Sequence, residues 1–557
     1  MFDAAPAEPG HASGTMNPHT ATGRLSLAAG AAVWTFLILG AAANLAYFYS
    51  RGLSNLYGDG IAHVEGARRI FDSLTPGYAE IGTVWLPLFH LLAAPLAQND
   101  FLWRSGLAGS LVSSAAFVLT AVFLFRLAVG LNQSLGAGAV TLAGYFLCPN
   151  MLYLAATPLT EPLAQLWAVA AIFGLHRYQE GGRTGALVSS GLAVFLGTLT
   201  RYDGWYLIPF ATLFVLLARK ESWSARIRHA LVFSFLAGLG PLLWLLHNAY
   251  RFGNAIEFYN GPFSAQAIYA HQLATTGFRY PTEGSLLAAG RYYLADLSLV
   301  IGVWPLALSA LGLIAWLVDA SERRRRAAAL LLLVPLLFYL HSLAYAAVPL
   351  YIPTLFPNTY YNLRYGLEML PALALLPSFL INRQFSKKIN TLLTGTLLVL
   401  LAGQSVSNLA VGTKQLPLVQ EGILNTPCQS KRQQAIIRFL RGRYAGGNVL
   451  VAVGKWPCVM PEVGIPFRKT LTEMNRKYWA KLLPAPENSV EWIIRGDADP
   501  VDELMRAHPH AFQEFEILKE KTFQGEGSVA IYRRRADERP GGTTPSTPKP
   551  SRRWPQS

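Results

Sequence analysis

The fold is decided by residues 24–69, which read RLSLAAGAAVWTFLILGAAANLAYFYSRGLSNLYGDGIAHVEGARR. An apolar run begins after Arg24 and continues from Leu25 to about Tyr49. Its length is close to the ~20 residues that a membrane helix needs, and it is too long for the apolar part of a usual signal peptide. No obvious small-residue cleavage pattern accompanies it. These residues therefore predict an uncleaved first membrane span, followed by a polar loop.

Further apolar runs along the chain are long enough to predict additional membrane spans. With the first run they give about eleven spans, so the predicted fold class is mostly α, a polytopic membrane helix bundle. The segment 85–97 is apolar but short and contains two prolines, so we expect it to be interfacial or re-entrant. The predicted spans after the first lie near 104–128, 136–155, 162–178, 185–200, 205–218, 230–249, 296–318, 327–347, 364–381 and 389–410.

The composition agrees with a membrane protein. Charged residues make up 14% of the 557 residues, against roughly 25% in ordinary soluble chains, and hydrophobic residues make up 52%. These values exclude a wholly soluble enzyme and a disordered chain. The three cysteines exclude a disulfide-rich scaffold and a multi-cysteine zinc module.

The basic residues indicate how the chain crosses the membrane. Lys plus Arg number 47 and Asp plus Glu number 32, which gives a net charge of +15. The basic residues form clumps between apolar runs, so we predict membrane lipids and no nucleic acid as partners. With the N-terminus in the cytoplasm, every dense clump falls on the cytoplasmic side of the inner (plasma) membrane, as the positive-inside bias predicts. These clumps are 177–183, 219–228, 323–326 and 383–388.

The two ends of the chain differ from the membrane part. Residues 1–23 and 536–557 are rich in small, polar and proline residues and are predicted to be disordered tails. We predict a membrane domain over 24–411. An odd number of spans places the following residues, 412–535, on the extracytoplasmic side, where the pattern predicts a small α/β domain.

Alternating helix and strand patterns predict that α/β domain. Cys428 and Cys458 both lie in it, where a disulfide could persist, but the sequence does not show whether they meet. Cys148 lies within a predicted span and is expected to be a small core residue. Helices are predicted at 429–444, 469–483 and 499–508, strands at 448–453 and 490–495, and a hairpin from 515–522 and 528–533.

The sequence lacks the common signatures of nucleotide and zinc sites. It has no G-x-x-x-x-G-K-[ST] loop and no strand followed by G-x-G-x-x-G. An ATP-driven transporter and an enzyme with a Rossmann domain for nucleotide sugars are therefore not expected. HExxH and CxxC are absent as well.

Asp59 is the first candidate for chemistry. It stands just before a predicted amphipathic helix whose apolar positions include Ile61, Val64 and Ala67, while His63 supplies one of its polar positions. One interpretation makes Asp59 the N-cap of this helix. The other makes it a catalytic carboxylate, held at the membrane interface by a helix that lies on the surface.

Glu161 is the second acidic candidate. One interpretation is again structural, with Thr160 as the helix cap, Glu161 in the first turn and Pro162 tolerated beside it. The other interpretation is catalytic, because the predicted topology places Glu161 at the same membrane face as Asp59.

Two arginine-containing segments lie at that same face. Arg201, Tyr202 and Asp203 form the start of one predicted span, where aromatic residues are ordinary interfacial residues and the two charges could simply pair. Arg364 and Glu368 are four residues apart at the start of another and could share a helix face. Ionisable residues at membrane depth are costly and therefore suggest function. A lipid phosphate would need arginine in such a place.

Together these motifs resemble the type C superfamily of integral-membrane glycosyltransferases, within it the protein O-mannosyltransferase and aminoarabinose-transferase-like group. The resemblance covers about Leu25 to Asn408. It rests on the order and common sidedness of the motifs rather than on any one of them. They are Asp59 ahead of the amphipathic helix, Thr160-Glu161-Pro162-Leu163, Thr200-Arg201-Tyr202-Asp203-Gly204-Trp205 and Asn362-Leu363-Arg364-Tyr365-Gly366.

The resemblance implies a polyprenyl-phosphate-linked sugar as donor and an extracytoplasmic glycan, lipid or protein as acceptor. It makes Asp59 and Glu161 the catalytic carboxylates, and the two residues that would hold a divalent metal ion if one is used. Two departures are clear: Gly60 replaces the second acidic residue of the eukaryotic mannosyltransferases, and no WWDYG-type motif is present. Transfer of a whole glycan to Asn is therefore not expected. The implied substrate-binding residues are His63, Arg201, Tyr202, Asp203, Arg364 and Tyr365.

The chemistry of the reaction needs the same residue types. Displacing a phosphate from an anomeric carbon requires a carboxylate to take the acceptor's proton and positive charge to stabilise the departing phosphate. One base and one phosphate clamp suffice for direct displacement, which predicts inversion. The alternative from another class is a non-catalytic transporter or flippase of polyprenyl-linked substrates. The sequence shows no clear internal repeat, which such transporters often have.

Overall fold

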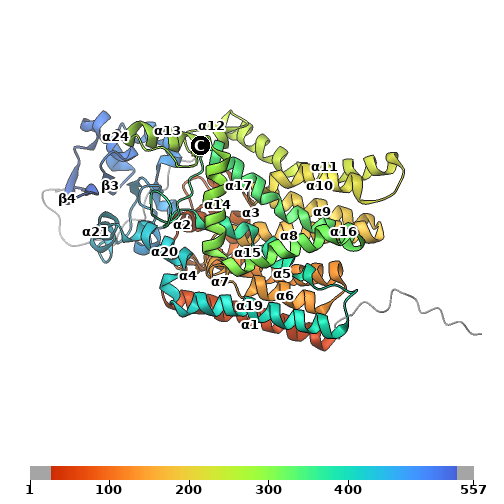
Figure 1. Cartoon of the computed structure of the whole chain (residues 1–557). Helices are drawn as coiled ribbons and strands as arrows, with labels where there is room; N and C mark the ends of the chain where they lie inside the picture. Colours follow the sequence, from red (N-terminus) through yellow and green to blue (C-terminus); the bar gives the residue numbers. More distant parts are fainter. Residues whose placement is uncertain (1–26, 536–557) are drawn as a thin grey trace, which may run out of the picture.

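The computed structural model describes residues 27–535, so both predicted tails, 1–23 and 536–557, lie outside the described residues. The chain forms a bundle of helices with a small α/β domain at one end (Figure 1). We call this end of the bundle the domain end and the opposite end the far end. The predicted fold class, a mostly α membrane bundle with a small α/β domain, is confirmed.

Several helices are long and apolar enough to cross a membrane, so the chain is an integral membrane protein. Within the described residues five helices meet this test, and up to seven do if each of two bent helix pairs counts as one span. The five are Gly30–Ser50 of α1 (Leu27–Ser50), α5 (Leu107–Asn132), α11 (Trp223–Phe252), Ala320–Tyr345 (α16, Ala320–Arg326; η2, Ala327–Leu333; α17, Val334–Tyr345) and α19 (Lys387–Ala410). The bent pairs are α6 (Leu135–Phe146) with α7 (Pro149–Ala155), at 67°, and α14 (Leu286–Val300) with α15 (Val303–Val318), at 113°.

The predicted count of about eleven spans is not confirmed. Two of the predicted spans are the short apolar helices α9 (Thr184–Thr198) and α10 (Asp203–Ala218), of 15 and 16 residues. The segment predicted as a span at 364–381 is divided among η3 (Leu363–Met369), α18 (Leu370–Leu375) and η4 (Leu376–Leu380). The predicted interfacial segment forms α3 (Leu88–Ala97), which at 10 residues is too short to span.

Small residues let the helices of the bundle approach closely. α8 (Glu161–Gly181) packs on α9, where a Cβ on Gly174 would lie 2.9 Å from the Ser190 side chain. The Ser190 hydroxyl donates a 2.7 Å hydrogen bond to the Ala171 carbonyl of α8. Close backbone contact and buried hydroxyl bonds are the usual stabilising features of helix pairs in a membrane, where apolar burial between helices adds little.

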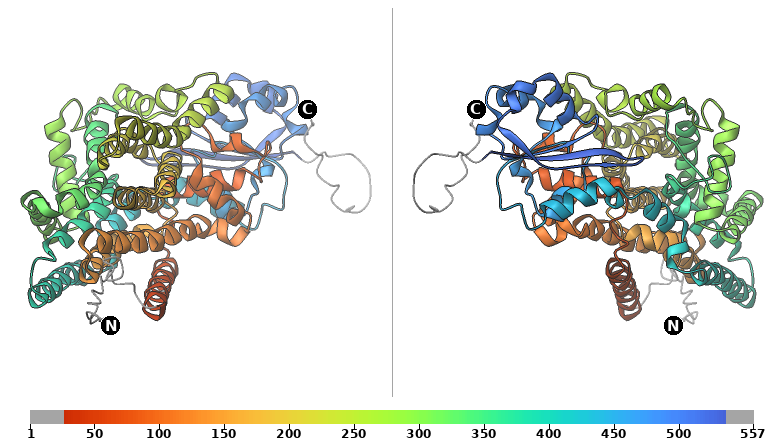
Figure 2. Two further views of the ribbon diagram at one scale, coloured as in Figure 1. Left: turned by 90° about the vertical axis from the view of Figure 1, so that its right-hand side faces the viewer. Right: turned by 90° about the vertical axis from the view of Figure 1, so that its left-hand side faces the viewer.

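The helix after Tyr57 forms as predicted but is more deeply covered than a surface helix. α2 (Gly58–Arg69) buries Ile61, Val64 and Ala67, and it also buries its polar residues His63 and Glu65. The cause is that α3 packs on one side of α2 and the α/β domain continues its apolar core onto the same helices (Figure 2). The α/β domain is thus docked on the loop that carries Asp59.

The α/β domain contains a five-stranded sheet in the order β2-β1-β3-β5-β4. β1 (Val449–Val451) pairs in parallel with β2 (Thr470–Leu471) and β3 (Trp492–Gly496), while β5 (Gly527–Arg534) is antiparallel to β3 and to β4 (Phe515–Phe523). The predicted hairpin and the helices α21 (Lys431–Leu440) and α24 (Pro500–Ala507) are confirmed. The helix predicted at 469–483 is wrong in its first half, because Thr470 and Leu471 pair with β1 and the helix α23 covers only Arg476–Leu482.

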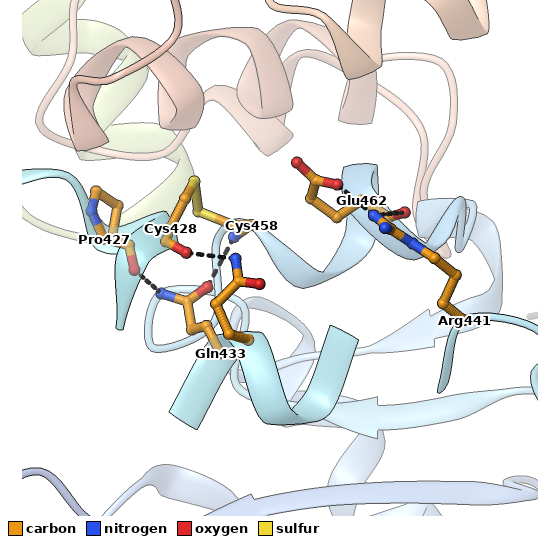
Figure 3. The surroundings of a disulfide bond; sticks show 7 residues. Pro427, Cys428, Gln433, Arg441, Cys458 and Glu462 are labelled. Carbon is orange, nitrogen blue, oxygen red and sulfur yellow. Dashed lines mark hydrogen bonds and ion pairs between the residues drawn. A yellow bond between two sulfur atoms is a disulfide. The ribbon is translucent and has the colours of Figure 1, made fainter. Parts of the chain in front are cut away.

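Cys428 and Cys458 form a disulfide, which the sequence left open (Figure 3). Gln433 of α21 bonds beside it, since its amide nitrogen donates to the Pro427 carbonyl and its oxygen accepts from the Cys458 backbone N–H, both at 3.0 Å. The bridge therefore fixes the segment that enters the domain against the rest of its core. Cys148 is a free, buried core residue, as predicted.

Candidate active site

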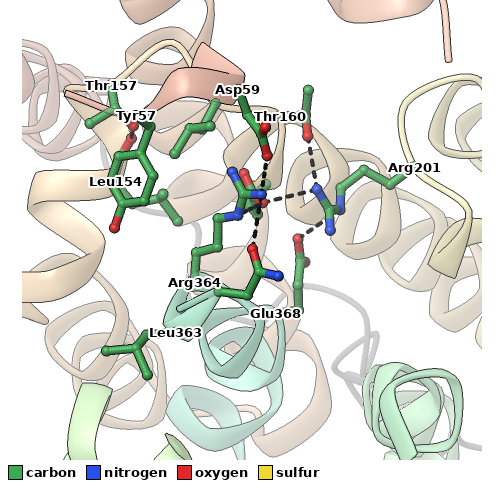
Figure 4. A network of polar contacts seen from close by, with 12 residues as sticks. Tyr57, Asp59, Leu154, Thr157, Thr160, Arg201, Leu363, Arg364 and Glu368 are labelled. Atoms are coloured by element: carbon green, nitrogen blue, oxygen red, sulfur yellow. Dashed lines mark hydrogen bonds and ion pairs between the residues drawn. The ribbon is translucent and has the colours of Figure 1, made fainter. Parts of the chain in front are cut away.

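Glu161 occupies the first turn of α8 and is fully buried at the domain end of the bundle. Figure 4 shows the network of polar contacts at this place, with Asp59, Arg201 and Arg364 labelled. The predicted cap, Thr160, stands at the N-cap position, but its side chain caps nothing. Its hydroxyl instead accepts a 2.9 Å hydrogen bond from Arg201 Nη1, and Glu161 Oε1 accepts another from the same nitrogen, also at 2.9 Å. The capping interpretation of Thr160 is therefore wrong, and the side chains of Thr160 and Glu161 both bind Arg201.

Arg201 lies two residues before α10 and joins side chains from several helices. Besides Thr160 and Glu161, its Nη2 donates to the Tyr339 hydroxyl of α17 at 3.0 Å. Its Nε lies 3.4 Å from Glu368 Oε1 and 3.8 Å from Asp203 Oδ2. Asp203 is thus more than a local charge partner, because it shares the arginine with two other carboxylates.

Arg364, at the start of η3, is the second arginine of the network. It bonds to Asp59, and its Nε lies 3.3 Å from Glu161 Oε1. Asp59 lies in the first turn of α2 rather than at the N-cap, so the capping interpretation of Asp59 is wrong as well. The spacing of Arg364 and Glu368 allowed the two to pair across one helix face; the ion pair that the structure gives Glu368 is with Arg201. Asp59 and Glu161 therefore meet through one guanidinium group.

The network holds two arginines and four carboxylates, a formal charge of 2 − 4 = −2. Glu161 is completely buried, whereas the Asp59 side chain is 46% exposed. Coulomb interactions are strong in such a dry place, and the planar arginine fork suits carboxylate and phosphate oxygens. An incoming anion would have to replace one of the carboxylates, and only Asp59 is exposed enough to move aside easily. Within residues 27–535, Glu161 Oε2 has no hydrogen-bond partner.

Of the six predicted substrate-binding residues, four meet in or beside this network: Arg201, Asp203, Arg364 and Tyr365. The Tyr365 ring stacks on Tyr339, and its centre lies 5.8 and 5.6 Å from the guanidinium carbons of Arg201 and Arg364. The other two have different partners. The Tyr202 hydroxyl donates to the Val84 carbonyl at 2.6 Å and accepts from Trp244 Nε1 at 3.0 Å, which ties a loop to α11.

His63 does not join the arginines by any hydrogen bond or ion pair in the described part of the chain. Its Nδ1 lies 3.1 Å from His90 Nε2, and its ring packs on Trp85 and Phe89. Burial lowers the pKa of His90 to about 4 and lowers the pKa of His63 well below its ordinary value. Both imidazoles are therefore neutral near pH 7, which does not fit a group that holds a phosphate by charge.

Two buried acids that the sequence motifs did not indicate lie beside the segment that carries Arg364, residues 362–366. Glu421 of α20 (Pro417–Asn425) accepts hydrogen bonds from the backbone N–H groups of Asn362 at 2.6 Å and Leu363 at 3.0 Å. It fixes the turn that carries Arg364, and burial raises its pKa to about 7. Asp296 of α14 is fully buried, and a Cβ on Gly366 would lie 2.8 Å from its Oδ2. An acid inside an apolar run was the signal that could have identified Asp296.

A pocket reaches the network from between the helices. It has a volume of about 40 Å³ and lies among α8, α9, α10 and α17. Most of its lining is apolar, while Asp203 and Glu368 of the network are also part of it. A lipid chain would need the helices to separate, but the arrangement is that of an apolar slot ending at paired charges.

The residues do not fit a divalent metal between Asp59 and Glu161. Arg364 already lies between the two carboxylates, so a cationic group fills the place that the ion would take. No group of three or more His, Cys, Asp or Glu side chains in the described part of the chain could hold a metal ion. Two carboxylates that share an arginine are a poor site for a hard cation that takes six or more oxygen ligands.

The fold and the site define a polytopic membrane protein with a buried arginine–carboxylate network at the end of its bundle, beside a docked α/β domain. Comparison with solved structures finds this fold in ArnT from Cupriavidus metallidurans, an aminoarabinose transferase of the type C glycosyltransferase superfamily. The structure bound to undecaprenyl phosphate is 12% identical with a TM-score of 0.57, and the match covers 90% of this chain and 98% of ArnT. The apo structure is 13% identical with a TM-score of 0.55, over 91% and 98% of the two chains.

No family model and no curated protein matches the chain. The likeness to ArnT is therefore one of fold, over nearly the whole length of both chains. The expectation drawn from the motifs is confirmed as a likeness of fold to ArnT.

Proposed function

We propose that the chain is a membrane glycosyltransferase that moves a sugar from a polyprenyl-phosphate donor to an extracytoplasmic glycan, lipid or protein acceptor. The observation that carries the proposal is the pair of arginines, Arg201 and Arg364, whose side chains are only 17% and 8% exposed. Two carboxylates of their network, Asp203 and Glu368, line a small, mostly apolar pocket between the helices. The fold of a protein whose structure holds undecaprenyl phosphate supports the same donor class.

In this proposal the donor phosphate binds the two arginines. It replaces Asp59 as a partner of Arg364, because Asp59 is the exposed carboxylate of the network. The freed Asp59 then accepts the proton of the acceptor hydroxyl as the acceptor oxygen forms its bond to the anomeric carbon. The bond from that carbon to the phosphate oxygen breaks, and polyprenyl phosphate leaves with its charge stabilised by Arg201 and Arg364. Direct displacement of this kind inverts the anomeric configuration.

Glu161 would contribute by holding both arginines, since it bonds Arg201 and contacts Arg364 while having no exposed surface. Its role as a second catalytic carboxylate stays a prediction from the resemblance. The domain division at 24–411 and 412–535, the inner-membrane location and the extracytoplasmic side of the site are part of the same proposal.

The test is transfer from a polyprenyl-phosphate sugar by the purified Asp59→Asn variant. We expect transfer to fall by at least ~10²-fold, as when a general base is lost, while binding of polyprenyl phosphate is retained. Asp100→Asn is the matched control, because Asp100 is 74% exposed and pairs with Arg68 rather than with the network. Normal transfer by Asp59→Asn would remove Asp59 from the mechanism, and a product with retained configuration would exclude direct displacement.

One observation favours the alternative, a transporter of polyprenyl-linked substrates. The two bent helix pairs meet, since Asn150 Nδ2 at the first break donates to the Val300 carbonyl at the second, at 2.8 Å. Transporters often build their sites at broken helices. The charged residues of the network, however, lie at the domain end. Flipping of a polyprenyl-linked sugar by Asp59→Asn at the wild-type rate, without any transfer by the wild type, would favour the transporter.

A further inference from the structure

A second pocket lies at the domain end, outside the arginine network. Its volume is about 210 Å³, and it is formed by α13 (Ala265–Thr276), the turn at 280–284 and the last residues of α17. Its polar and aromatic lining consists of Gln266, Tyr269, Tyr280, Glu283 and Tyr345. We call it the tyrosine pocket.

The tyrosine pocket is built rigidly. The turn at 280–284 is fixed to the end of α17 by two hydrogen bonds of 2.8 Å, from Thr282 Oγ1 to the Leu343 carbonyl and from the Gly284 N–H to the Ala344 carbonyl. The rings of Tyr269 and Tyr280 lie 4.1 Å apart between their centres. The wall and the floor are therefore held in place before any ligand arrives, which lowers the entropy cost of binding.

The lining combines aromatic faces with a carboxylate and an amide. The Tyr269 hydroxyl donates to Glu283 Oε2 at 2.8 Å, and Arg279 Nη1 lies 3.5 Å from the same oxygen. Among the described residues, the structure gives no hydrogen bond to Glu283 Oε1 or to the Gln266 amide. A sugar ring suits such a lining, because its C–H faces pack on aromatic rings while its hydroxyls donate to a carboxylate.

The volume and the charge of the tyrosine pocket restrict the class of ligand further. The volume of about 210 Å³ is below the ~300–1,000 Å³ of pockets that take drug-sized ligands, which favours one sugar ring over a nucleotide. Glu283 balances Arg279, so the pocket has no excess positive charge to select a phosphate. These features favour a neutral monosaccharide unit.

The pocket is coupled to the arginine network through α17. Tyr339 of this helix accepts from Arg201, and Leu343 and Ala344, four and five residues later, form the pocket floor. At ~1.5 Å per residue the two sites lie roughly 6–8 Å apart along the helix. A sugar in the pocket would thus hold its neighbouring hydroxyl close to the reaction centre.

We propose that the tyrosine pocket binds a neutral sugar unit of the acceptor, so that the acceptor is a carbohydrate. This inference rests on the proposed function, which by itself leaves glycan, lipid and protein acceptors open. Glu283 and Tyr345 are positioning residues in this scheme, and they take no part in proton transfer.

The test is saturation-transfer NMR on the full-length protein in nanodiscs, with the methyl glycosides of mannose, glucose and N-acetylglucosamine as probes. We expect at least one glycoside to bind, and Glu283→Gln to weaken it about tenfold through the loss of one hydrogen bond to a charged group. Tyr345→Ala should weaken it by a comparable factor through the loss of aromatic packing on the sugar. Both residues are exposed enough to change without unfolding the chain, at 38% for the Glu283 side chain and 54% for Tyr345.

Two residues of the same types outside the pocket serve as controls. Glu257→Gln and Tyr250→Ala, which lie outside the pocket, should bind the glycoside like the wild type. Asp59→Asn should also bind it normally even if transfer is lost, so the binding test can fail or succeed independently of the proposed reaction. The inference is overturned if no glycoside binds, or if both pocket variants bind as tightly as the wild type.

Discussion

The bundle has a buried charge network at each end, and the two are built differently. At the domain end, Arg201 and Arg364 bond to side chains: carboxylates from α2, α8, α10 and η3, a threonine and a tyrosine. At the far end, Arg326 donates to the Phe379 and Ile381 carbonyls, both at 3.3 Å. α8, whose first residue is Glu161, separates the two networks by roughly 30 Å.

The carboxylates differ in the same way. Asp319 at the far end caps α16, since its Oδ1 accepts from the backbone N–H groups of Ser321 and Glu322. Glu322 pairs with Arg325 and with Arg383, whose side chain is 54% exposed. Backbone groups of helix ends are satisfied there, as any buried helix end requires. The domain-end network satisfies few backbone groups, so the free energy lost by desolvating its charges is not offset by the capping of helix ends.

Burial of charge therefore does not by itself identify a functional site. Both networks are buried arginine–carboxylate sets, and both lie near basic or acidic sequence motifs. The kind of partner distinguishes them: backbone carbonyls and caps at the far end, exchangeable side-chain oxygens at the domain end. Four comparisons of variants test whether this difference in partners and burial has the expected effects.

The largest expected effect concerns the arginines themselves. Arg364→Lys keeps the charge but loses the planar fork, so it should lower transfer by about 10²–10³-fold, as when one donor to a developing charge is lost. Arg326→Lys is the matched change at the far end and should leave transfer per folded molecule unchanged. The measurement is the rate of transfer from a polyprenyl-phosphate sugar, normalised to folded protein. Equal losses from both variants would erase the distinction.

The next effect is on stability. Glu161→Gln leaves Arg201 and Arg364 short of a completely buried partner and should lower the free energy of unfolding by about 3 kcal/mol. Glu322→Gln should cost less, about 2 kcal/mol, because only one of its two partners, Arg325, is mostly buried, while Arg383 is half exposed and water can solvate it. Thermal unfolding in detergent measures both. A larger loss from Glu322→Gln would mean that the far-end network is the tighter one.

The sequence predicted much of this arrangement because membrane helices leave strong signals. The apolar runs, the common sidedness of Asp59, Glu161, Arg201 and Arg364, and the pattern of the α/β domain all follow from local composition. The fold resemblance followed from the order of these motifs. Long-range pairing is what local patterns do not contain, so Asp59 and Thr160 were each open to interpretation as helix caps.

The predictions that the structure contradicts or that the sequence missed also depend on long-range packing. His63 occupies a polar position of α2, but Trp85, Phe89 and His90 pack on its ring, which no pattern within the helix reveals. The bend of 113° between α14 and α15 occurs inside a continuous apolar run, so the sequence predicted one span there. Glu421 lies beyond the last span and acts on a backbone turn 58 residues away, at Leu363.

Glu65 extends the comparison to a buried carboxyl that belongs to neither network. It is 3% exposed, and burial raises its pKa to about 8, with Glu473 adding to the shift and Arg69 opposing it. The folded protein therefore holds a proton that the unfolded chain releases above its ordinary pKa of 4.5. Stability should fall as pH rises from about 5 to 8, by up to about 1.4 kcal/mol for each pH unit.

Glu65→Gln should be more stable than the wild type at pH 8 and should show a flatter pH dependence in thermal unfolding. Glu421, with its pKa raised to about 7, acts in the same direction, so the slope is reduced rather than abolished. Glu462→Gln is the exposed control and should follow the wild-type curve. A wild-type stability that rises between pH 5 and pH 8 would show that Glu65 is ionised and paired.

The smallest effect is expected where a salt bridge has good geometry but no burial. Arg441 Nη2 lies 2.7 Å from Glu462 Oε2, with side chains 61% and 49% exposed (Figure 3). Water screens this pair and competes for both groups, so Arg441→Ala should change the free energy of unfolding by less than about 0.5 kcal/mol. Its N–O distance is even shorter than the 2.9 Å between Arg201 and Glu161, so contact distance does not explain the difference expected between the two pairs. If thermal unfolding of Arg441→Ala showed a loss as large as that of Glu161→Gln, the environment would not be what sets the strength of these networks, and contact distance would have to replace it.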